Sequence, residues 1–334
     1  MIGIGEKSLA GGTASRFIVQ PVALTSHTAP LTAAQAARLR EVLEDRGYEF
    51  EEKPYTLYAA KKGKLNVAVF AKGPKVLIQG KDTEDFIRFL LEPEVLGEAK
   101  LGYEEELDPE MYAPHFGIDE SGKGDYFGPL VIAGVYTDAP VARALKAAGV
   151  MDSKRIASAK RIRDLAAKIR EVPGIAVSIV AIGPERYNEM FSSFGNLNRL
   201  LAWGHAKVIS NLAGQRPACP RALSDQFARP EVLARALKQQ GVEIQLDQRT
   251  KGESDIAVAA ASILARERFV DWIDKTSASG GVLLPLGASA AVVEAARQVI
   301  AKHGPEALAK VAKMHFKTTS AVSGDSNASG MDSA

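Results

Sequence analysis

The 334-residue sequence has one cysteine, no long apolar run and almost no net charge. Cys219 cannot form an internal disulfide, and none of the five histidines lies near it at the spacing of a zinc site. No apolar stretch approaches the ~20 residues that span a bilayer, and the N-terminus lacks the basic start and apolar core of a signal peptide. These absences predict a cytoplasmic protein that is neither secreted nor bound to a membrane.

The charges nearly balance, with 42 Lys and Arg against 40 Asp and Glu. An acidic polymer is therefore a partner only if basic residues gather locally, and composition alone does not indicate nucleic-acid binding. The 46% hydrophobic and 25% charged content is typical of a globular protein, and the length allows two domains.

Patterning predicts a small N-terminal α+β domain at residues 16–100. Apolar residues at helical spacing alternate there with strand-like runs, separated by turns that contain Gly or Pro. The expected helices are 32–47 and 82–97, and the expected strands are 55–63, 65–73 and 75–80. Residues 1–15 and 320–334 are rich in Gly, Ser and Ala and are predicted to be disordered, and the acidic stretch 101–114 is predicted to be a linker.

Residues 115–319 predict a larger α/β domain. No long helical pattern separates its first two strand-like runs, whereas the later runs alternate with helices. We therefore expect a mixed sheet covered by helices. The strand-like runs are 115–120, 129–137, 175–183, 221–227 and 242–248. The helical patterns are 158–172, 196–214, 230–241 and 254–274.

The motif "GIDESGKGD" at 117–125 allows two interpretations. Gly117, Gly122 and Lys123 match the G-x-x-x-x-G-K spacing of a phosphate-binding P-loop. Such a loop needs Ser or Thr after its lysine and a helix directly behind it, but Gly124 and a strand-like run follow here. We therefore favour the alternative, in which the carboxylates of this loop bind a divalent metal.

Four carboxylates occupy positions that suit such a metal site. Asp119 and Glu120 end one strand-like run, Asp225 closes another, and Asp255 opens the long helix. Each alone has a structural alternative, since acids are common in turns and Asp is a frequent helix cap. Together they can converge on one rim of the sheet, and that density of like charge calls for a metal.

The N-terminal domain mixes basic and aromatic residues along its strands. This pattern favours contact with a nucleic-acid backbone, although lysines on hairpins also commonly form a solvated face and guarded edge. The residues concerned are Lys53, Lys61, Lys62, Lys64, Lys72, Lys75, Lys81, Tyr55, Tyr58 and Phe70.

Several stretches together resemble bacterial ribonuclease HIII of the type 2 ribonuclease H family. They are "PHFGIDESGKGDYFGPLVIAG" at 114–134, "DSK" at 152–154, "LSDQF" at 223–227, "ESDIAVAAASILAR" at 253–266 and "KMHFKTT" at 313–319. The resemblance implies an RNase H-like mixed sheet with flanking helices, preceded by a small TATA-binding-protein-like α+β domain that binds substrate. We assign His315 and Phe316 of the last motif to packing.

The same resemblance implies an endonuclease that hydrolyses the RNA strand of RNA/DNA hybrids during replication and repair, giving 5′-phosphate and 3′-hydroxyl ends. It implies two ions of Mg²⁺ or Mn²⁺ on Asp119, Glu120, Asp225 and Asp255 as the catalytic residues. Substrate contacts are expected from Ser121, Gly122, Lys123, Gly124, Ser153 and Lys154, and a monomer is expected. A P-loop hydrolase and a non-catalytic nucleic-acid-binding module are the competing classes.

Overall fold

The computed structural model describes residues 24–98, 107–151, 153, 156, 158–250 and 252–323. The chain divides into two compact units, Met1–Leu101 and Gly102–Ala334, which are described separately. The predicted disordered segment 1–15 lies outside the described residues, as do most of the predicted tail and the first part of the predicted linker. No helix in the described ranges is long and apolar enough to cross a membrane.

The smaller unit is a five-stranded antiparallel sheet in the order β1-β5-β4-β3-β2. The strands are β1 (Ser26–Pro30), β2 (Glu49–Glu51), β3 (Thr56–Lys62), β4 (Leu65–Phe70) and β5 (Lys75–Gln79). The predicted strands were found, whereas β1 and β2 were not predicted. The polar "SHTAP" and the three-residue "EFE" carry too little apolar alternation to be recognised.

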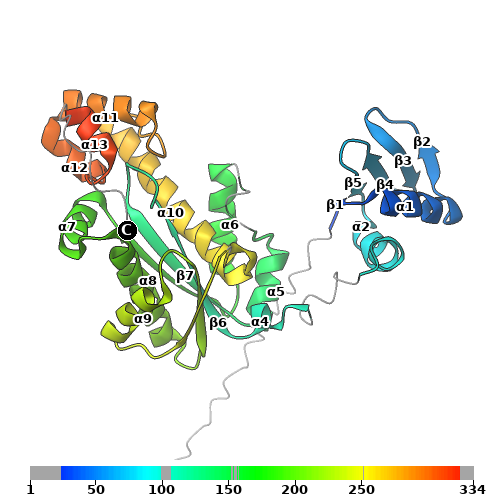
Figure 1. The fold of residues 1–334 in the computed structure, drawn as a ribbon, viewed down its shortest axis with the longest axis horizontal. Helices are drawn as coiled ribbons and strands as arrows, with labels where there is room; N and C mark the ends of the chain where they lie inside the picture. The colour runs from blue at the N-terminus through cyan, green and yellow to red at the C-terminus, as the bar shows by residue number, and fades with distance from the viewer. Residues whose placement is uncertain are drawn as a thin grey trace, which may run out of the picture. The chain divides into compact units, whose positions relative to one another are not determined.

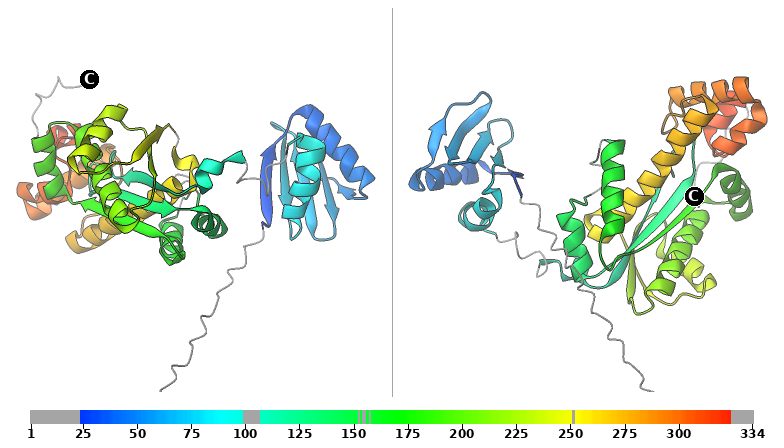
Figure 2. Two further views of the ribbon diagram at one scale, coloured as in Figure 1. Left: turned by 90° about the horizontal axis from the view of Figure 1, so that it is seen from below. Right: turned by 180° about the vertical axis from the view of Figure 1, so that it is seen from behind.

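Helices cover one face of this sheet (Figures 1 and 2). Helix α1 (Ala33–Asp45) begins with a reciprocal capping box between Thr32 and Gln35 and buries the stripe Ala36, Leu39, Val42 and Leu43. Helix α2 (Thr83–Phe86) runs directly into the helical segment η1 (Ile87–Leu96). Alternate residues of β4 and β5 fill the space beneath them, so the unit has its own core.

The larger unit is built on a mixed sheet in the order β10-β9-β6-β7-β8. Strands β6 (His115–Ser121), β7 (Leu130–Thr137) and β8 (Ala176–Ile182) form an antiparallel meander. Strands β9 (Arg221–Asp225) and β10 (Gln245–Arg249) add in parallel beside β6. The predicted mixed α/β sheet is confirmed.

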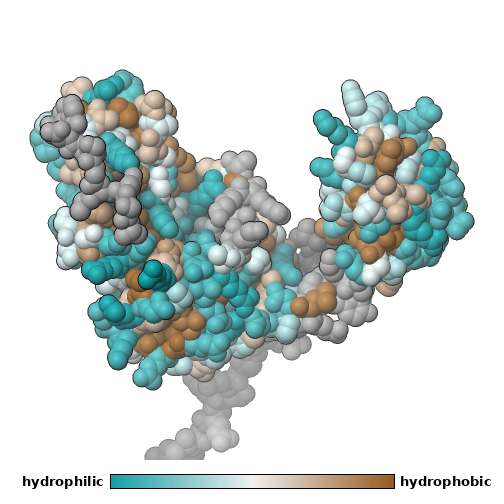
Figure 3. All heavy atoms as spheres, viewed as in Figure 1, coloured by the Kyte–Doolittle hydropathy of each residue, from teal (hydrophilic) through white to brown (hydrophobic). Residues whose placement is uncertain are grey.

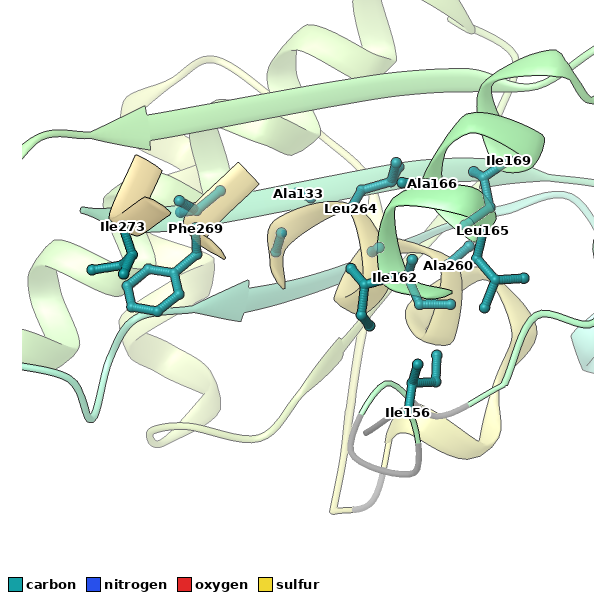
Figure 4. Packing of buried hydrophobic residues seen from close by; sticks show 14 of the residues in the cluster. Ala133, Ile156, Ile162, Leu165, Ala166, Ile169, Ala260, Leu264, Phe269 and Ile273 are labelled. Atoms are coloured by element: carbon teal, nitrogen blue, oxygen red, sulfur yellow. The ribbon is translucent and has the colours of Figure 1, made fainter. Parts of the chain in front are cut away.

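Two apolar cores lie on opposite faces of this sheet. One contains α5 (Ala139–Ala147), α6 (Ala159–Glu171) and α10 (Ile256–Gly280), and the other contains α7 (Pro184–Phe194), α8 (Leu197–Gln215) and α9 (Pro230–Gln239). In Figure 4, Ile162, Leu165 and Ile169 of α6 lie against Ala260 and Leu264 of α10. The central strands of the sheet are therefore buried on both faces.

Helix α10 packs unusually close to β6. A Cβ atom on Gly117 would lie 2.3 Å from the backbone of Ala257 and Val258. The alanine-rich first half of α10 supplies the matching flat surface, with every residue from Ile256 to Ala265 buried. This contact fixes the helix directly behind the strand that carries Asp119 and Glu120.

Short elements occupy the ends of the larger unit. Helix α4 (Pro109–Tyr112) forms within the segment predicted as linker. Helices α11 (Ala290–His303), η4 (Pro305–Ala307), α12 (Leu308–Val311) and α13 (Lys317–Ser323) follow α10, and α13 extends past the predicted domain end at 319. These C-terminal elements pack beside the end of α10 (Figure 1).

Candidate active site

A cleft of about 360 Å³ opens at the end of β6. The lining includes nearly all of the site residues predicted from sequence. The lining residues are Asp119, Glu120, Ser121, Gly122, Lys123, Gly124, Asp125, Ser153, Asp225, Ser262, Arg266, Phe269, Val270 and Leu286. Of the predicted residues, Asp255 does not line it and Lys154 lies outside the described residues.

Strand register explains why three acids meet in this cleft. Strands β6 and β9 are parallel, and Ile118 pairs with Ser224. The next residues along the two strands are Asp119 and Asp225, so both carboxylates emerge at the same edge of the sheet. Glu120 follows within β6. The predicted convergence of the first three acids is present in the structure.

Asp119 has surroundings that disfavour its negative charge. Burial, together with the neighbouring charges of Glu120 and Asp225, raises its pKa to about 7. A hydrogen bond from the Ser262 hydroxyl and one from the Glu120 amide, 2.8 Å from Oδ1, oppose this shift only in part. The site therefore has an excess of negative charge that a cation would relieve.

Glu120 is held by a buried histidine. His205 Nε2 donates to Glu120 Oε2 at 3.1 Å, and Ser224 Oγ lies 3.0 Å from the other ring nitrogen. Burial alone would raise the pKa of Glu120, but His205 and the Lys123 ammonium, 3.7 Å from Oε1, outweigh it and lower this pKa. His205 lies on α8 and is fully buried. Sequence reasoning missed it because this contact is between elements distant in the chain.

Asp255, the fourth predicted acid, lies at the start of α10 and contacts its backbone. Its carboxylate accepts hydrogen bonds from the amides of Ala257 and Val258 at 2.8 and 3.1 Å, as the N-cap of α10. His115 Nε2 donates to the same carboxylate at 3.0 Å, and the other ring nitrogen lies 2.7 Å from the Ala113 carbonyl oxygen. Asp255 is 7% exposed and faces these partners. The structure therefore does not bring it together with the other three acids.

One side of the cleft is formed by α10. Ser153 Oγ lies 2.6 Å from Ser262 Oγ, and Arg266 Nη1 donates to the Ser153 carbonyl at 2.8 Å. Ser262 and Arg266 were not predicted as site residues. Their spacing carries the signal, since positions four apart share a face of a helix and Phe269 and Val270 continue that face into the cleft.

The loop after β6 has no room for a side chain at Gly122, where it lies close to the backbone of Pro129. A Cβ on Gly122, whose φ is +88°, would lie 2.2 Å from the Pro129 carbonyl oxygen. Gly124, by contrast, has open space around its Cα. Asp125 Oδ1 accepts a hydrogen bond from the Gly287 amide at 2.7 Å. The loop is thus fixed at both ends, with Lys123 and Gly124 presented between them.

The donor chemistry of the cleft fits a hard divalent cation. Carboxylate oxygens are the ligands that Mg²⁺ and Mn²⁺ prefer, and the raised pKa of Asp119 reflects its burial and the like charges beside it. In the part of the chain that the structure describes, no three acidic, histidine or cysteine side chains form a ready-made metal site. An ion would therefore need to draw the carboxylates together, at the expense of contacts such as Lys123 with Glu120.

Comparisons with known proteins identify the same region. A family model described as Ribonuclease HII matches residues 116–319. The chain is 43% identical to the Ribonuclease HIII of Protochlamydia amoebophila over 289 residues, which cover 86% of this chain and 94% of that protein. It is 39% identical over 305 residues to the Ribonuclease HIII of Chlamydia trachomatis serovar L2, covering 91% and 99%.

Solved structures match the whole fold or its larger part. The crystal structure of Bst-RNase HIII in complex with Mn²⁺ matches with a TM-score of 0.63 and 27% identity, over 91% of this chain and 99% of that one. The RNase HII of Archaeoglobus fulgidus, solved in a complex with PCNA, matches 62% of this chain and 96% of its own with a TM-score of 0.52 and 29% identity. The match to nearly the whole of Bst-RNase HIII includes the N-terminal sheet unit and confirms the predicted fold. The chain therefore belongs to the ribonuclease HII family, and within it to the ribonucleases HIII.

Proposed function

We propose that this ribonuclease hydrolyses the RNA strand of RNA/DNA hybrids with the help of two divalent ions, Mg²⁺ or Mn²⁺, and leaves 5′-phosphate and 3′-hydroxyl ends. The observation that supports this most directly is the meeting of Asp119, Glu120 and Asp225 at one sheet edge beside a glycine-lysine loop. The Mn²⁺ complex of Bst-RNase HIII supports the choice of cation.

Each side chain of the cleft has a part in this proposal. Asp119, Glu120 and Asp225 would hold the ions, which supply charge stabilisation at the phosphate and lower the pKa of a water molecule. His205 and Gly252 orient two of these carboxylates, since the Gly252 amide donates to Asp225 Oδ1 at 3.1 Å. Asp119 must lose its proton before it binds a cation.

A fourth carboxylate completes the predicted set, and two residues compete for that place. Asp255 was the residue predicted from sequence, but its oxygens already serve the α10 cap and His115. The short helix Gly252–Ser254 begins at the glycine whose amide reaches Asp225, and Glu253 belongs to it. We infer that Glu253 is the fourth acid and that Asp255 is structural.

Recognition of the hybrid is assigned to the loop after β6 and to Ser153. Ser121, Gly122, Lys123 and Gly124 present backbone amides and one ammonium group at the cleft, where phosphate oxygens and the ribose 2′-hydroxyl would bind. Lys154 is proposed as a further substrate contact on the basis of its sequence motif. The N-terminal unit is proposed to bind the hybrid backbone.

The cellular setting of this activity is also a proposal. A cytoplasmic monomer that removes RNA from hybrids during replication and repair is consistent with the single cysteine and with the relatives' enzyme class. RNA/DNA hybrids form where DNA is copied into RNA or where RNA primes DNA synthesis, and a cytoplasmic enzyme would share a compartment with the chromosome.

The test is cleavage of a labelled RNA/DNA hybrid with Mg²⁺ or Mn²⁺, beside DNA/DNA and RNA/RNA duplexes. Only the hybrid should be cut, and the ends should carry the phosphate and hydroxyl groups stated above. Asp119→Asn should raise the activation barrier by several kcal/mol and so lower the cleavage rate on the order of 10³-fold. Glu243→Gln, at an exposed acid of the same unit, should leave it unchanged. Tight hybrid binding without cleavage by the unmodified protein would instead indicate a binding module, and metal-dependent ATP hydrolysis without hybrid cleavage a P-loop enzyme.

A further inference from the structure

Lys313 is a fully buried lysine in the C-terminal motif "KMHFKTT". Its ammonium group donates to the carbonyl oxygen of Asp125 at 2.7 Å and faces that of Phe127 at 3.4 Å. The rings of Tyr187 and Phe269 lie 5.7 and 6.0 Å away, measured from ring centroid to Nζ. The charge of this side chain is thus directed at the backbone of the loop that follows β6.

Burying an ammonium group is costly. Burial lowers the pKa of Lys313 to about 7, although the nearby Asp125 carboxylate opposes the shift. An apolar residue of similar size would fill the same space without that cost. The buried nitrogen is explained by what it contacts, which is the carbonyl oxygens of Asp125 and Phe127 in the loop rather than any strand of the sheet.

The backbone around Lys313 is joined to the same loop. The Lys313 amide donates to the Tyr126 carbonyl at 2.8 Å, the Gly128 amide donates to the Val311 carbonyl at 2.9 Å, and Phe127 forms an isolated bridge with Ala312. Residues 311–313 therefore hold residues 125–128 as an additional short strand would. The other half of the loop, Gly122–Gly124, lines the cleft.

We propose that Lys313 is a positioning residue for substrate binding, because its ammonium group fixes the backbone of residues 125–127 and thereby holds the Gly122–Gly124 segment ready for the nucleic acid. This rests on the proposed function of that segment as a substrate contact. Pre-ordering the segment removes an entropy cost that binding would otherwise carry. Loss of the Lys313 ammonium group weakens binding of the substrate and of the transition state equally, so KM rises while kcat changes little.

The experiment compares Lys313→Met, which keeps the length and apolar stem, with Lys310→Met, an exposed lysine in the same C-terminal segment. Lys313→Met is expected to raise KM for the hybrid, and Kd measured with EDTA, about tenfold, with kcat within about threefold of the unmodified enzyme. Amide hydrogen exchange should quicken in residues 122–128 and stay unchanged in β8. Lys310→Met should change none of these quantities.

An unchanged KM in folded Lys313→Met, with or without a lower Tm, would overturn the proposal and leave Lys313 a stability residue. Should this variant fail to fold, Lys313→Ala is assayed with methylammonium chloride, which can restore an ammonium group in the vacated space. Tetramethylammonium chloride at the same concentration is the control, since it has no N–H donor. A KM restored by methylammonium alone supports the proposal, and equal effects of both salts contradict it.

These outcomes are separable from a failure of the proposed function. If the unmodified chain neither binds nor cuts the hybrid, the function is wrong. If it cuts the hybrid and Lys313→Met does so with the same KM, only the role of Lys313 is wrong.

Discussion

At the scale of single residues, two adjacent carboxylates of β6 have opposite electrostatic surroundings. Asp119 faces like charges and burial, which raise its pKa to about 7. Glu120 faces His205 and Lys123, which lower its pKa despite burial. One sequence position thus separates a group that readily keeps a proton from one that is already charged and held in place.

Metal binding should depend on pH through Asp119. Since its pKa is raised from 3.8 to about 7, a proton competes with the cation below that pH. The affinity for Mn²⁺ is expected to fall about tenfold for each pH unit below 7 and to level off above it. Calorimetric titration of the unmodified chain at several pH values checks this. An affinity that is constant between pH 5 and 8 would contradict the proposed role of Asp119.

The raised pKa of Asp119 also makes the stability of the metal-free protein depend on pH. A carboxyl group whose pKa is raised on folding favours the folded state at low pH, and this contribution is lost as pH rises from about 4 to 7. Asp119→Asn should therefore raise Tm at pH 8, on the order of 5 °C, and have a smaller effect at pH 5. Glu120→Gln should lower Tm at pH 8, because the pKa of Glu120 shifts the other way. Thermal melts in EDTA measure both.

A pair of substitutions decides which acid completes the metal set. Asp255→Ala removes the cap of α10 and its contact with His115, so we expect a loss of roughly 2 kcal/mol in the free energy of unfolding, with kcat of the folded protein nearly unchanged. Glu253→Gln should lower kcat at least tenfold. Urea melts and kinetics on both variants test this, and the reverse pattern would restore Asp255 as a metal ligand.

At the scale of elements, the helix α10 behind β6 sets the position of the site. Gly117→Ala places a Cβ 2.3 Å from the α10 backbone, which no side-chain rearrangement can relieve. We expect a loss of about 3 kcal/mol or more in the free energy of unfolding. Gly214→Ala, within α8 and with open space around it, should be neutral or stabilising by up to about 1 kcal/mol. Chemical denaturation of both variants provides the comparison.

The elements that sequence could predict are those with long apolar periodicity. The strand-like runs 115–120 and 221–227 and the helix starting near Asp255 were all expected, and from them four acids were predicted at one edge, of which three line the cleft. For Asp255, a helix cap and a metal ligand look alike in the sequence, and the contact with His115 is what favours the cap. The His205–Glu120 contact depends on how α8 packs across the sheet, which local patterns do not encode.

At the scale of the whole molecule, the smaller unit offers fewer free basic residues than its sequence suggests. The Tyr58 hydroxyl donates to the Ala36 carbonyl, and Lys62 donates to the Arg46 carbonyl. Lys53 and Lys61 pair with Glu51 and Glu49. Tyr55, by contrast, is 89% exposed, and the face drawn in Figure 3 shows apolar side chains of this unit bordered by polar ones. The predicted basic-aromatic surface is thus reduced to a smaller set.

The exposed lysines of this unit should contribute to hybrid binding through charge. Lys72→Gln combined with Lys75→Gln removes two exposed ammonium groups from the turn and strand after β4. The slope of log Kd against log salt should fall by about 1.5, and affinity should fall equally for hybrids of any sequence. Lys168→Gln with Lys238→Gln, exposed in the larger unit, is the charge-matched control. Equal effects of the two pairs would assign the binding to net charge rather than to the smaller unit.

The contact between Lys313 and the loop after β6 also orders events during synthesis. Asp125 and Lys313 are 188 residues apart in the chain, so the ribosome has made the strand that carries Asp119 and Glu120 long before it adds the lysine that contacts the neighbouring loop. A nascent chain that has already formed its sheet therefore still lacks this contact with the loop after β6. The loop beside the cleft is therefore without its buried lysine while residues 126–312 are being made.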